Sequence, residues 1–304
     1  MCHAHRTADP QSVTLAELVL HRGEIVHETY GPDTGPDTTL ISWSTGKSVT
    51  HALVGVAVRD GLADLDAPAP VPEWAGDERS AITLRQLLNM TSGLRFVEDY
   101  VDDSVSHCID MLFGEGHTDV AHYAASLPLD HPPGSTFNYS SGTTNIVSRA
   151  VGQAVGGGEV GMRVFMEAEL FGPLGMTSAD PRFDAAGTFV GSSFLYCTAR
   201  DFARFGQLYL ADGVWEGRRI LPEGWVDFAR TPVPVPVEEE FGYGAHWWLW
   251  DGHGFPGTFA AHGYEGQYII VRPDRDLVVV RLGKTPIEVR PPVIERLKEL
   301  LASW

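Results

Sequence analysis

Hydrophobic residues at β-strand spacing, interrupted by short turn sequences, occur near both ends of the chain. They predict two hairpins and one further strand. The first hairpin turns at His21-Arg22-Gly23 and the second at Pro273-Asp274-Arg275-Asp276, where glycine, proline and aspartate favour tight turns. The predicted strands are Leu15–Leu20, Glu24–Tyr30, Tyr243–Trp250, Gly266–Arg272 and Leu277–Leu282.

Between these strands the hydrophobic residues recur mainly at helical spacing. Thr83 and Gln86 form a capping-box pattern at the start of one predicted helix, and Thr198 opens another. A helix at the end of the chain has a hydrophobic stripe that should pack against the sheet. The predicted helices are Val49–Val58, Leu84–Met90, Asn145–Val155, Thr198–Leu210 and Pro291–Trp304.

Strands at both ends with helices between them indicate an α+β fold. We expect one antiparallel sheet, assembled from the two ends of the chain and flanked by helices. The proline-rich stretch Asp66–Pro72 marks the crossing into a mostly helical part. The predicted organisation is therefore a discontinuous α/β domain of residues 1–68 and 190–304, a mostly helical domain of residues 69–189, and an active site at their interface.

The polar sequence Ser44-Thr45-Gly46-Lys47 precedes the hydrophobic run Val49–Val58, which predicts a buried helix that ends near Gly61. Ser44 then lies at or next to the N-cap. Residues three apart share a helix face, so the Ser44 hydroxyl and the Lys47 ammonium can meet there. Lysine is unfavourable near the positive end of a helix dipole, and glycine is unfavourable in a first turn. Two residues that are unfavourable for a helix N-terminus, so close together, suggest a functional site.

Ser44 and Lys47 have the chemistry of a nucleophile and its base. The helix dipole and burial both favour neutral lysine, which can take the proton of a serine hydroxyl. The alternative is that Ser44 only caps the helix while Lys47 extends to solvent. The chain has few lysines, and one lies in a hydrophobic neighbourhood, which favours the catalytic interpretation. The lysines are Lys47, Lys284 and Lys298.

Two other motif families do not fit. A phosphate-binding loop that ends in Gly46-Lys47-Ser48 needs a glycine where this chain has Ile41. An α/β-hydrolase needs a Gly-x-Ser-x-Gly elbow, and the sequence has none.

Composition and charge exclude further classes. A net charge of −18 over 304 residues argues against nucleic acid or an anionic membrane as a partner, because both bind basic surfaces. The start Met1–Arg6 lacks the hydrophobic core of a signal peptide, and no run is long enough to span a membrane, so we expect a cytoplasmic protein. The histidine spacing matches no zinc site, and we expect neither a metal nor a cofactor. The cysteines, expected as free thiols, are Cys2, Cys108 and Cys197.

Two further stretches carry candidate chemistry. Tyr139 lies in the loop Phe137–Gly142 before a predicted helix, where its hydroxyl can exchange protons with a serine and a lysine or contact water. In Ala261–Gln267, glycines at a strand entrance indicate close approach of another segment, or of a substrate carbonyl that needs an N–H donor. His262 can orient a substrate carboxylate or simply pack. Nearby tryptophans are more typical of core or rim packing than of recognition: Trp247, Trp248 and Trp250.

The order of these motifs resembles the serine β-lactamase and penicillin-binding-protein superfamily. It is most similar to the class C-like branch, which includes family VIII esterases and 6-aminohexanoate-dimer hydrolases. The resemblance extends from about Ile41 to Leu282. Besides the Ser-x-x-Lys motif it includes Leu87–Leu94, Glu98–Asp102 and Cys197–Arg204, and the last two segments look most like 6-aminohexanoate-dimer hydrolases.

The resemblance implies a role for each motif. Ser44 is the acylated nucleophile, Lys47 is its base, and Tyr139 carries the proton to the leaving group. The N–H groups of Ser44 and of the strand near Tyr264 form the oxyanion hole. A tyrosine matching Tyr100 belongs to a mobile lid over the substrate. The residues that we assign to substrate binding are Tyr100, Ser141, Trp247, His262, Tyr264 and Gly266.

The chain also departs from the class C β-lactamases. Their Tyr-x-Asn is replaced by Tyr139-Ser140-Ser141, and their Lys-Thr-Gly by a sequence like His262-Gly263-Tyr264. The lysine and threonine of that motif help to hold the carboxylate of a β-lactam, so their absence weakens the case for antibiotic hydrolysis.

We therefore predict a serine hydrolase that cleaves a small ester or linear amide through an acyl-serine. Three alternatives stay open: a DD-peptidase or β-lactamase, a small-molecule acyltransferase, and a non-catalytic binding protein on the same scaffold. The expected partner is the small-molecule substrate, and the resemblance implies that the chain can form a homodimer.

Overall fold

The computed structural model describes residues 12–98 and 106–304. Its largest sheet consists of β1 (Val13–His21), β2 (Glu24–Tyr30), β8 (Gly242–Tyr243), β9 (Trp248–Leu249), β10 (Phe259–Gly263), β11 (Gln267–Arg272) and β12 (Leu277–Lys284). Shorter strands are β3 (Leu40–Ile41), β4 (Asp180–Pro181), β5 (Leu195–Cys197), β6 (Val214–Trp215) and β7 (Arg218–Arg219).

The helices of the described residues lie mostly between β3 and β8 in the sequence. They are α1 (Gly46–Arg59), α2 (Leu84–Leu88), α3 (His107–Phe113), α4 (Val120–Ser126), α5 (Ser141–Val155), α6 (Gly158–Met166), α7 (Gly172–Leu174), α8 (Ala199–Leu210), α9 (Trp225–Arg230) and α10 (Pro291–Ala302).

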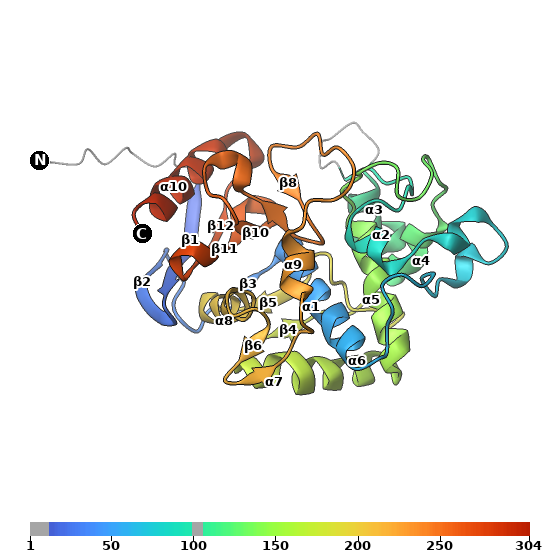
Figure 1. Cartoon of the computed structure of the whole chain (residues 1–304), viewed down its shortest axis with the longest axis horizontal. Helices are drawn as coiled ribbons and strands as arrows, with labels where there is room; N and C mark the ends of the chain where they lie inside the picture. Colours follow the sequence, from blue (N-terminus) through green and yellow to red (C-terminus); the bar gives the residue numbers. More distant parts are fainter. Residues whose placement is uncertain (1–11, 99–105) are drawn as a thin grey trace, which may run out of the picture.

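The large sheet joins the two ends of the chain. Its strand order is β2-β1-β12-β11-β10-β9-β8, and β1 pairs antiparallel with β12 (Figure 1). Both predicted hairpins are present, as β1–β2 and β11–β12. The predicted α+β fold, with one antiparallel sheet from both chain ends, is confirmed. The boundaries between residues 1–68, 69–189 and 190–304 stay a prediction.

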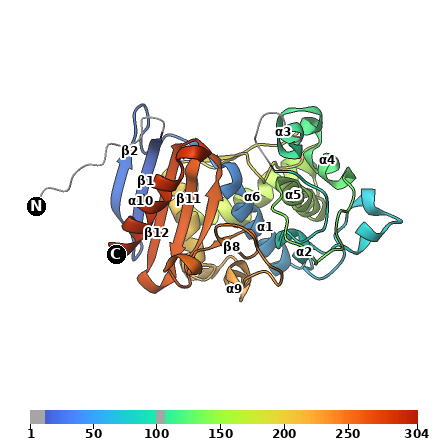
Figure 2. The same ribbon diagram turned by 90° about the horizontal axis from the view of Figure 1, so that it is seen from above.

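Helices cover both faces of this sheet. On one face, α10 packs through Val293, Ile294, Leu297 and Leu301, as its hydrophobic stripe predicted. Seen from above in Figure 2, α10 lies over the strands. On the other face lie α8 and α1, and beyond α1 come α5 and the helices α2–α4 (Figure 1). Helix α1 is thus enclosed between the sheet and α5, which explains why it is hydrophobic on nearly every side.

Two strand predictions differ from the structure. The stretch Tyr243–Trp250 is not one strand, because the chain turns between β8 and β9, where His246 has a positive φ of 56°. The buried strand β10 was not predicted, because Phe259–Gly263 contains two alanines and a glycine and lacks β-branched residues. Helix α5 begins at Ser141 rather than at Asn145, since the Ser140 side chain accepts from the Thr143 N–H and caps it.

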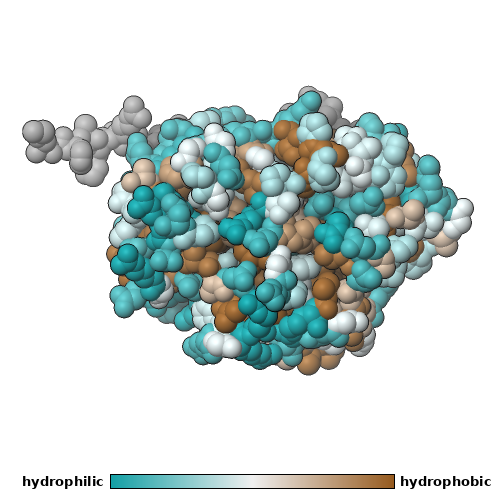
Figure 3. Space-filling view, viewed as in Figure 1, coloured by the Kyte–Doolittle hydropathy of each residue, from teal (hydrophilic) through white to brown (hydrophobic). Residues whose placement is uncertain are grey.

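The capping predictions are confirmed. Thr83 and Gln86 form both hydrogen bonds of a capping box at α2, and Thr198 caps α8 by accepting from the Asp201 N–H. Within residues 12–98 and 106–304, no helix is long and hydrophobic enough to cross a membrane. The face drawn in Figure 3 is mainly hydrophilic, with several separate hydrophobic patches.

Candidate active site

The N-terminal turn of α1 places Ser44 and Lys47 on one face. Trp43–Thr45 forms a single 3-10 turn that leads into α1, and Thr45 is the N-cap. Ser44 therefore lies directly before the N-cap. The Lys47 amino group is 2.9 Å from the Ser44 hydroxyl oxygen, although the Lys47 side chain is almost fully buried at 2% exposure. The contact inferred from the sequence spacing is thus present in the fold.

Every proton of the Lys47 amino group has an acceptor. Besides Ser44, Nζ lies 2.9 Å from Ser141 Oγ and 3.3 Å from the carbonyl oxygen of Ser192. A protonated Lys47 can donate to all three oxygens. A neutral Lys47 can donate to Ser141 and Ser192 while it accepts from the Ser44 hydroxyl. The same geometry therefore accommodates Lys47 before and after it takes a proton from Ser44.

Glu98 supplies a negative charge next to this pair. Its carboxylate accepts from the Ser141 N–H at 2.8 Å and from the Ser141 hydroxyl at 2.5 Å, at the N-terminal end of α5. One of its oxygens is 3.9 Å from Lys47 Nζ. The helix dipole and the ammonium both favour a carboxylate there. Glu98 had no predicted role, although it opens the segment Glu98–Asp102 that carried the resemblance.

Tyr139 completes the group. The Lys47 Nζ lies 4.8 Å from the centre of its ring. Burial raises the pKa of Tyr139, while the charge of Lys47 and hydrogen bonds with Ser44 and Lys47 oppose the increase. The phenol is therefore protonated at neutral pH, with its hydroxyl close to both Ser44 and Lys47. The structure thus brings together Ser44, Lys47 and Tyr139, the three residues expected to be catalytic.

Ser44 and Tyr139 line a cavity of about 540 Å³. This volume is in the range of small-molecule sites, about 300–1,000 Å³. Aromatic side chains and carboxylates form much of its lining. The lining residues are Ser44, Phe96, Val97, Glu98, Asn138, Tyr139, Glu239, Glu240, Phe241, Trp248, His262, Gly263, Tyr264, Glu265, Thr285, Ile287 and Arg290.

His262 lines this cavity as a neutral side chain. Burial, with smaller effects from the charges of Arg290 and His253, holds its pKa well below the usual value. The Trp250 indole N–H donates to His262 Nε2 at 2.9 Å, so Nε2 is the acceptor and the ring proton resides on Nδ1. The ring also stacks on Trp248. His262 is therefore a hydrogen-bonding group and not a cation.

The Ser44 segment lies directly beside the start of the turn after β10. A Cβ atom on Gly263 would lie only 2.6 Å from the carbonyl oxygen of Ser42, so this approach requires glycine. The rings of Trp43 and Tyr264 meet edge to face, with centroids 5.6 Å apart. The prediction that glycine in Ala261–Gln267 permits close approach of another segment therefore holds at Gly263.

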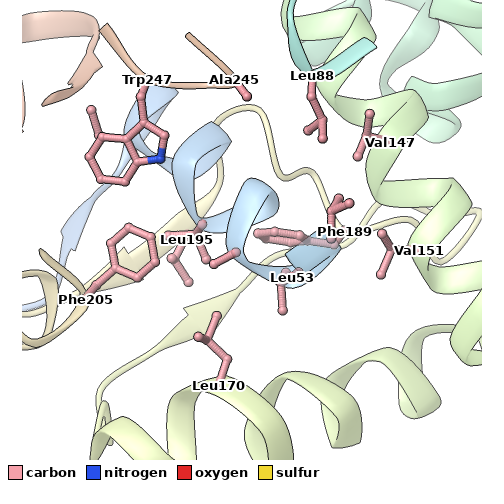
Figure 4. Packing of buried hydrophobic residues seen from close by; sticks show 14 of the residues in the cluster. Leu53, Leu88, Val147, Val151, Leu170, Phe189, Leu195, Phe205, Ala245 and Trp247 are labelled. Atoms are coloured by element: carbon pink, nitrogen blue, oxygen red, sulfur yellow. The ribbon is translucent and has the colours of Figure 1, made fainter. Parts of the chain in front are cut away.

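Three of the residues assigned to substrate binding do not line the cavity. Trp247 is fully buried and faces Phe205 in the core (Figure 4), and the neighbouring Trp248 lines the cavity instead. Ser141 is fully buried behind Lys47. Gly266 packs against Arg281, where a Cβ atom would lie 2.3 Å from a guanidinium nitrogen. Contrary to the prediction, the structure therefore places none of these three residues on the cavity wall. Tyr100 lies outside the described residues.

His246 supports the catalytic turn from behind and was missed in the sequence. Its Nδ1 donates to the Lys47 carbonyl at 3.0 Å, and its own carbonyl accepts from the Ser48 hydroxyl at 2.7 Å. Thr144 of α5 lies 3.3 Å from Nε2. Burial and the charge of Lys47 lower the pKa of His246 to about 3. A neutral His246 thus ties α1 to α5. No motif in the sequence around His246, which precedes the core residue Trp247, indicated this role.

Within the described parts of the chain, no group of three or more histidine, cysteine, aspartate or glutamate side chains could hold a metal ion. Cys108 and Cys197 are buried, with no disulfide between them. The strongest candidate for chemistry is the group of Ser44, Lys47 and Tyr139, because these side chains lie together beside a cavity.

Comparisons with known proteins agree with this fold. A 6-aminohexanoate-dimer hydrolase from Paenarthrobacter ureafaciens is 28% identical over 295 residues, covering 91% of this chain and 74% of the relative. A Bacillus anthracis structure, provisionally described as a 6-aminohexanoate-dimer hydrolase, superposes with a TM-score of 0.81 at 22% identity, over 96% of this chain and 79% of its own.

A family VIII carboxylesterase structure has the same fold, with a TM-score of 0.67 at 16% identity, over 90% of this chain and 87% of its own. The family model described as Beta-lactamase matches residues 4–302, almost the whole chain. The superfamily resemblance inferred from the motifs is thereby confirmed. The chain belongs to the Beta-lactamase family.

Proposed function

We propose that this protein is a serine hydrolase that cleaves a small ester or linear amide through an acyl-enzyme on Ser44. Membership of the Beta-lactamase family supports a hydrolase of this class. The 6-aminohexanoate-dimer hydrolase among its relatives supports an ester or amide substrate. The observation that carries the proposal is the 2.9 Å contact between Ser44 Oγ and the buried Lys47 Nζ, below a cavity that Tyr139 also lines.

In the acylation step, neutral Lys47 takes the Ser44 proton as Oγ attacks the substrate carbonyl carbon. The carbonyl π electrons move to its oxygen, and the N–H groups of Ser44 and Tyr264 stabilise the resulting oxyanion. When the tetrahedral intermediate collapses, the bond to the leaving alcohol or amine breaks. Tyr139 gives that group its proton and regains one from Lys47.

In deacylation, a water molecule replaces the leaving group. Tyr139 and Lys47 take a proton from the water as it attacks the acyl carbon, and Ser44 Oγ leaves as the hydroxyl when that proton returns to it. The carboxylic acid product is released and the resting state is restored. Glu98 acts on Lys47 through Ser141 and by its charge, since one carboxylate oxygen lies 3.9 Å from Lys47 Nζ.

The cavity wall favours an uncharged ester or linear amide over a β-lactam carboxylate. Strand β10 presents neutral His262 and no cation. The guanidinium of Arg290, on the cavity wall, pairs with Glu240 at 3.5 Å. Three carboxylates at the wall and rim, of Glu98, Glu239 and Glu265, further disfavour an anionic substrate.

The test is covalent labelling of the whole protein. Wild type, Ser44→Ala and the surface control Ser135→Ala are treated with a p-nitrophenyl ester or a serine-directed phosphonate and weighed by intact-mass spectrometry. We expect one adduct on wild type and on the control, and none on Ser44→Ala. Equal labelling of all three proteins, or no labelling of any, would contradict the acyl-serine mechanism.

The substrate class is tested by comparing turnover of the same ester with nitrocefin and penicillin G. We expect ester turnover at least 100-fold higher in kcat/KM. A higher kcat/KM for either β-lactam would overturn the preference and return the DD-peptidase or β-lactamase alternative.

A further inference from the structure

One hydrogen bond joins the two backbone segments that border the nucleophile. Trp43 immediately precedes Ser44, and Glu265 immediately follows Tyr264. The Trp43 indole N–H donates to the Glu265 carboxylate at 3.2 Å, although 222 positions separate these residues in the sequence. The Trp43 ring also meets the Tyr264 ring edge to face at an interplanar angle of 87°. The two segments are therefore linked directly beside the reacting centre.

Both linked residues have a backbone conformation that side chains rarely adopt. The φ angle is 43° at Trp43 and 59° at Glu265. Outside glycine, such left-handed residues persist only where the surrounding structure holds them, and they cluster at functional sites. Neither residue is glycine or asparagine, so an interaction of the side chains must compensate for the unfavourable backbone conformation. The hydrogen bond between Trp43 and Glu265 is such an interaction.

The Glu265 segment is fixed from its other side by β12. The Thr285 N–H donates to the Glu265 carbonyl at 3.1 Å. The buried Arg281 guanidinium donates to the Gly266 carbonyl at 2.6 Å and lies 3.3 Å from that of Glu265. These contacts hold the Glu265 segment to the sheet. They do not involve the Ser44 segment, so they do not set the distance between the two segments. Trp43 is placed to set that spacing.

We propose that the hydrogen bond from Trp43 to Glu265 sets the separation of the two oxyanion-hole donors, the N–H groups of Ser44 and Tyr264. Trp43 and Glu265 are then positioning residues, which act through the backbone and not on the substrate. This inference rests on the proposed function, because it assumes an oxyanion at this place.

The energetic logic follows from how such a hole works. Its donors stabilise the oxyanion only when they lie about 2.7–3.1 Å from its oxygen, and losing one donor lowers kcat by about 100- to 1,000-fold. Loosening the spacing should cost part of that. We expect kcat to fall about 10-fold in Trp43→Phe and in Glu265→Ala, with KM changed less than twofold. Phenylalanine keeps the ring contact with Tyr264 but has no N–H donor.

The double variant separates a shared interaction from two independent ones. If both residues act through one hydrogen bond, the combined loss in kcat should equal the single losses and not their product. Glu265→Gln retains an acceptor oxygen without the charge, so its kcat should stay within about twofold of wild type. If Trp43→Phe fails to fold, the contrast between Glu265→Gln and Glu265→Ala still carries the test.

A second readout reports on the oxyanion itself. A boronic acid forms a tetrahedral anionic adduct with a serine and resembles the transition state, while the p-nitrophenyl ester reports ground-state binding through KM. We expect Glu265→Ala to weaken boronic acid binding about as much as it lowers kcat. A merely structural defect would lower the Tm, but its loss of boronic acid affinity would not equal its loss in kcat. Trp215→Phe and the exposed Glu223→Ala, neither of which lines the cavity, serve as matched controls.

The outcomes distinguish this inference from the proposed function. If Ser44 of wild type is labelled but Glu265→Ala keeps wild-type kcat and boronic acid affinity, the positioning role is wrong and the acyl-serine mechanism stands. Multiplicative losses in the double variant also overturn the single shared interaction. If wild type is not labelled at all, both fail. The inference is supported if the double variant loses no more kcat than either single variant and if Glu265→Gln keeps a kcat near that of wild type.

Discussion

At the scale of single residues, the protonation of Tyr139 bears directly on the proposed mechanism. Burial raises the pKa of this phenol. In the proposed reaction it therefore acts as a proton donor, and Lys47, 2.9 Å from Ser44 Oγ, acts as the base. A protonated phenol matters most when the leaving group cannot depart without a proton. Amines need that proton, whereas p-nitrophenolate leaves without it.

Tyr139→Phe should therefore affect amides more than activated esters. We expect a loss in kcat of about 1,000-fold for a linear amide, inside the range of about 100- to 10,000-fold for general acid–base effects, and a smaller loss of about 10-fold for a p-nitrophenyl ester. Parallel steady-state assays of one acyl group with the two leaving groups measure both. Equal losses for the two substrates would remove Tyr139 from leaving-group protonation.

The predicted contact between Ser44 and Lys47 is present in the structure, while the catalytic roles of the site residues stay a proposal. Ser44 and Lys47 are one helical turn apart, and Tyr139 stands out in a short polar loop. Glu98, His246 and Trp248 were missed, because each gains its place through contacts between distant segments. The error at Trp247 has a simple cause, since adjacent residues of an extended segment point to opposite sides and only the fold decides which faces the cavity.

At the scale of elements, the N-terminus of α1 is fitted closely against its neighbours. Gly46 looked unfavourable for a helix in the sequence, and the structure explains it. A Cβ atom at Gly46 would lie 2.8 Å from the Gly191 carbonyl oxygen and 3.1 Å from Ser42 Oγ. Glycine is therefore needed for close packing of this turn.

Gly46→Ala should lower stability despite the better helix propensity of alanine. We expect a loss of about 1–3 kcal/mol, the usual cost of forcing an extra methyl into a packed site, together with a reduced kcat because Ser44 and Lys47 move. Urea denaturation and ester turnover measure the two effects.

Gly152→Ala in α5 is the matched control. No atom lies within 4 Å of its added Cβ, so propensity alone should stabilise it, by up to about 1 kcal/mol. If Gly46→Ala behaved like this control, close packing at the N-terminus of α1 would not be the reason for glycine.

At the scale of the whole molecule, neutral buried histidines connect the separate layers. His246 links α1 to α5, His51 contacts Tyr209 of α8 and Trp225 of α9, and His262 lies under Trp248. Burial is the main cause that lowers the pKa of each one, to about 3 for His246 and well below the usual value for the other two. Folding therefore keeps these side chains unprotonated.

Stability should consequently fall as the solution becomes acidic. Unfolded histidine titrates near 6.5, so below that pH the unfolded chain binds protons that the native state refuses. The stability is fully present above about pH 6.5 and is lost toward the lower native pKa values. Each such histidine contributes a limiting slope of about 1.4 kcal/mol per pH unit, or about 4 kcal/mol for three.

Urea denaturation at pH 7.5, 6.5 and 5.5 measures this slope. His246→Gln should reduce it by about one third, whatever its effect on stability at pH 7.5. The exposed His131→Gln should leave the slope unchanged. A stability that does not vary over this pH interval would mean that the buried histidines become protonated without unfolding.

The sequence by itself determined both hairpins of the large sheet, the capped helices and the contact between Ser44 and Lys47. Hairpins, capped helices and the Ser-x-x-Lys spacing depend on interactions between near neighbours, which the order of residues specifies directly. The tertiary structure alone decided the two-residue strands β8 and β9, the placing of Glu98 beside Lys47, and the link from Trp43 to Glu265. Those features depend on which distant segments meet, and the free energy of close packing in the folded chain, rather than any local preference, selects them.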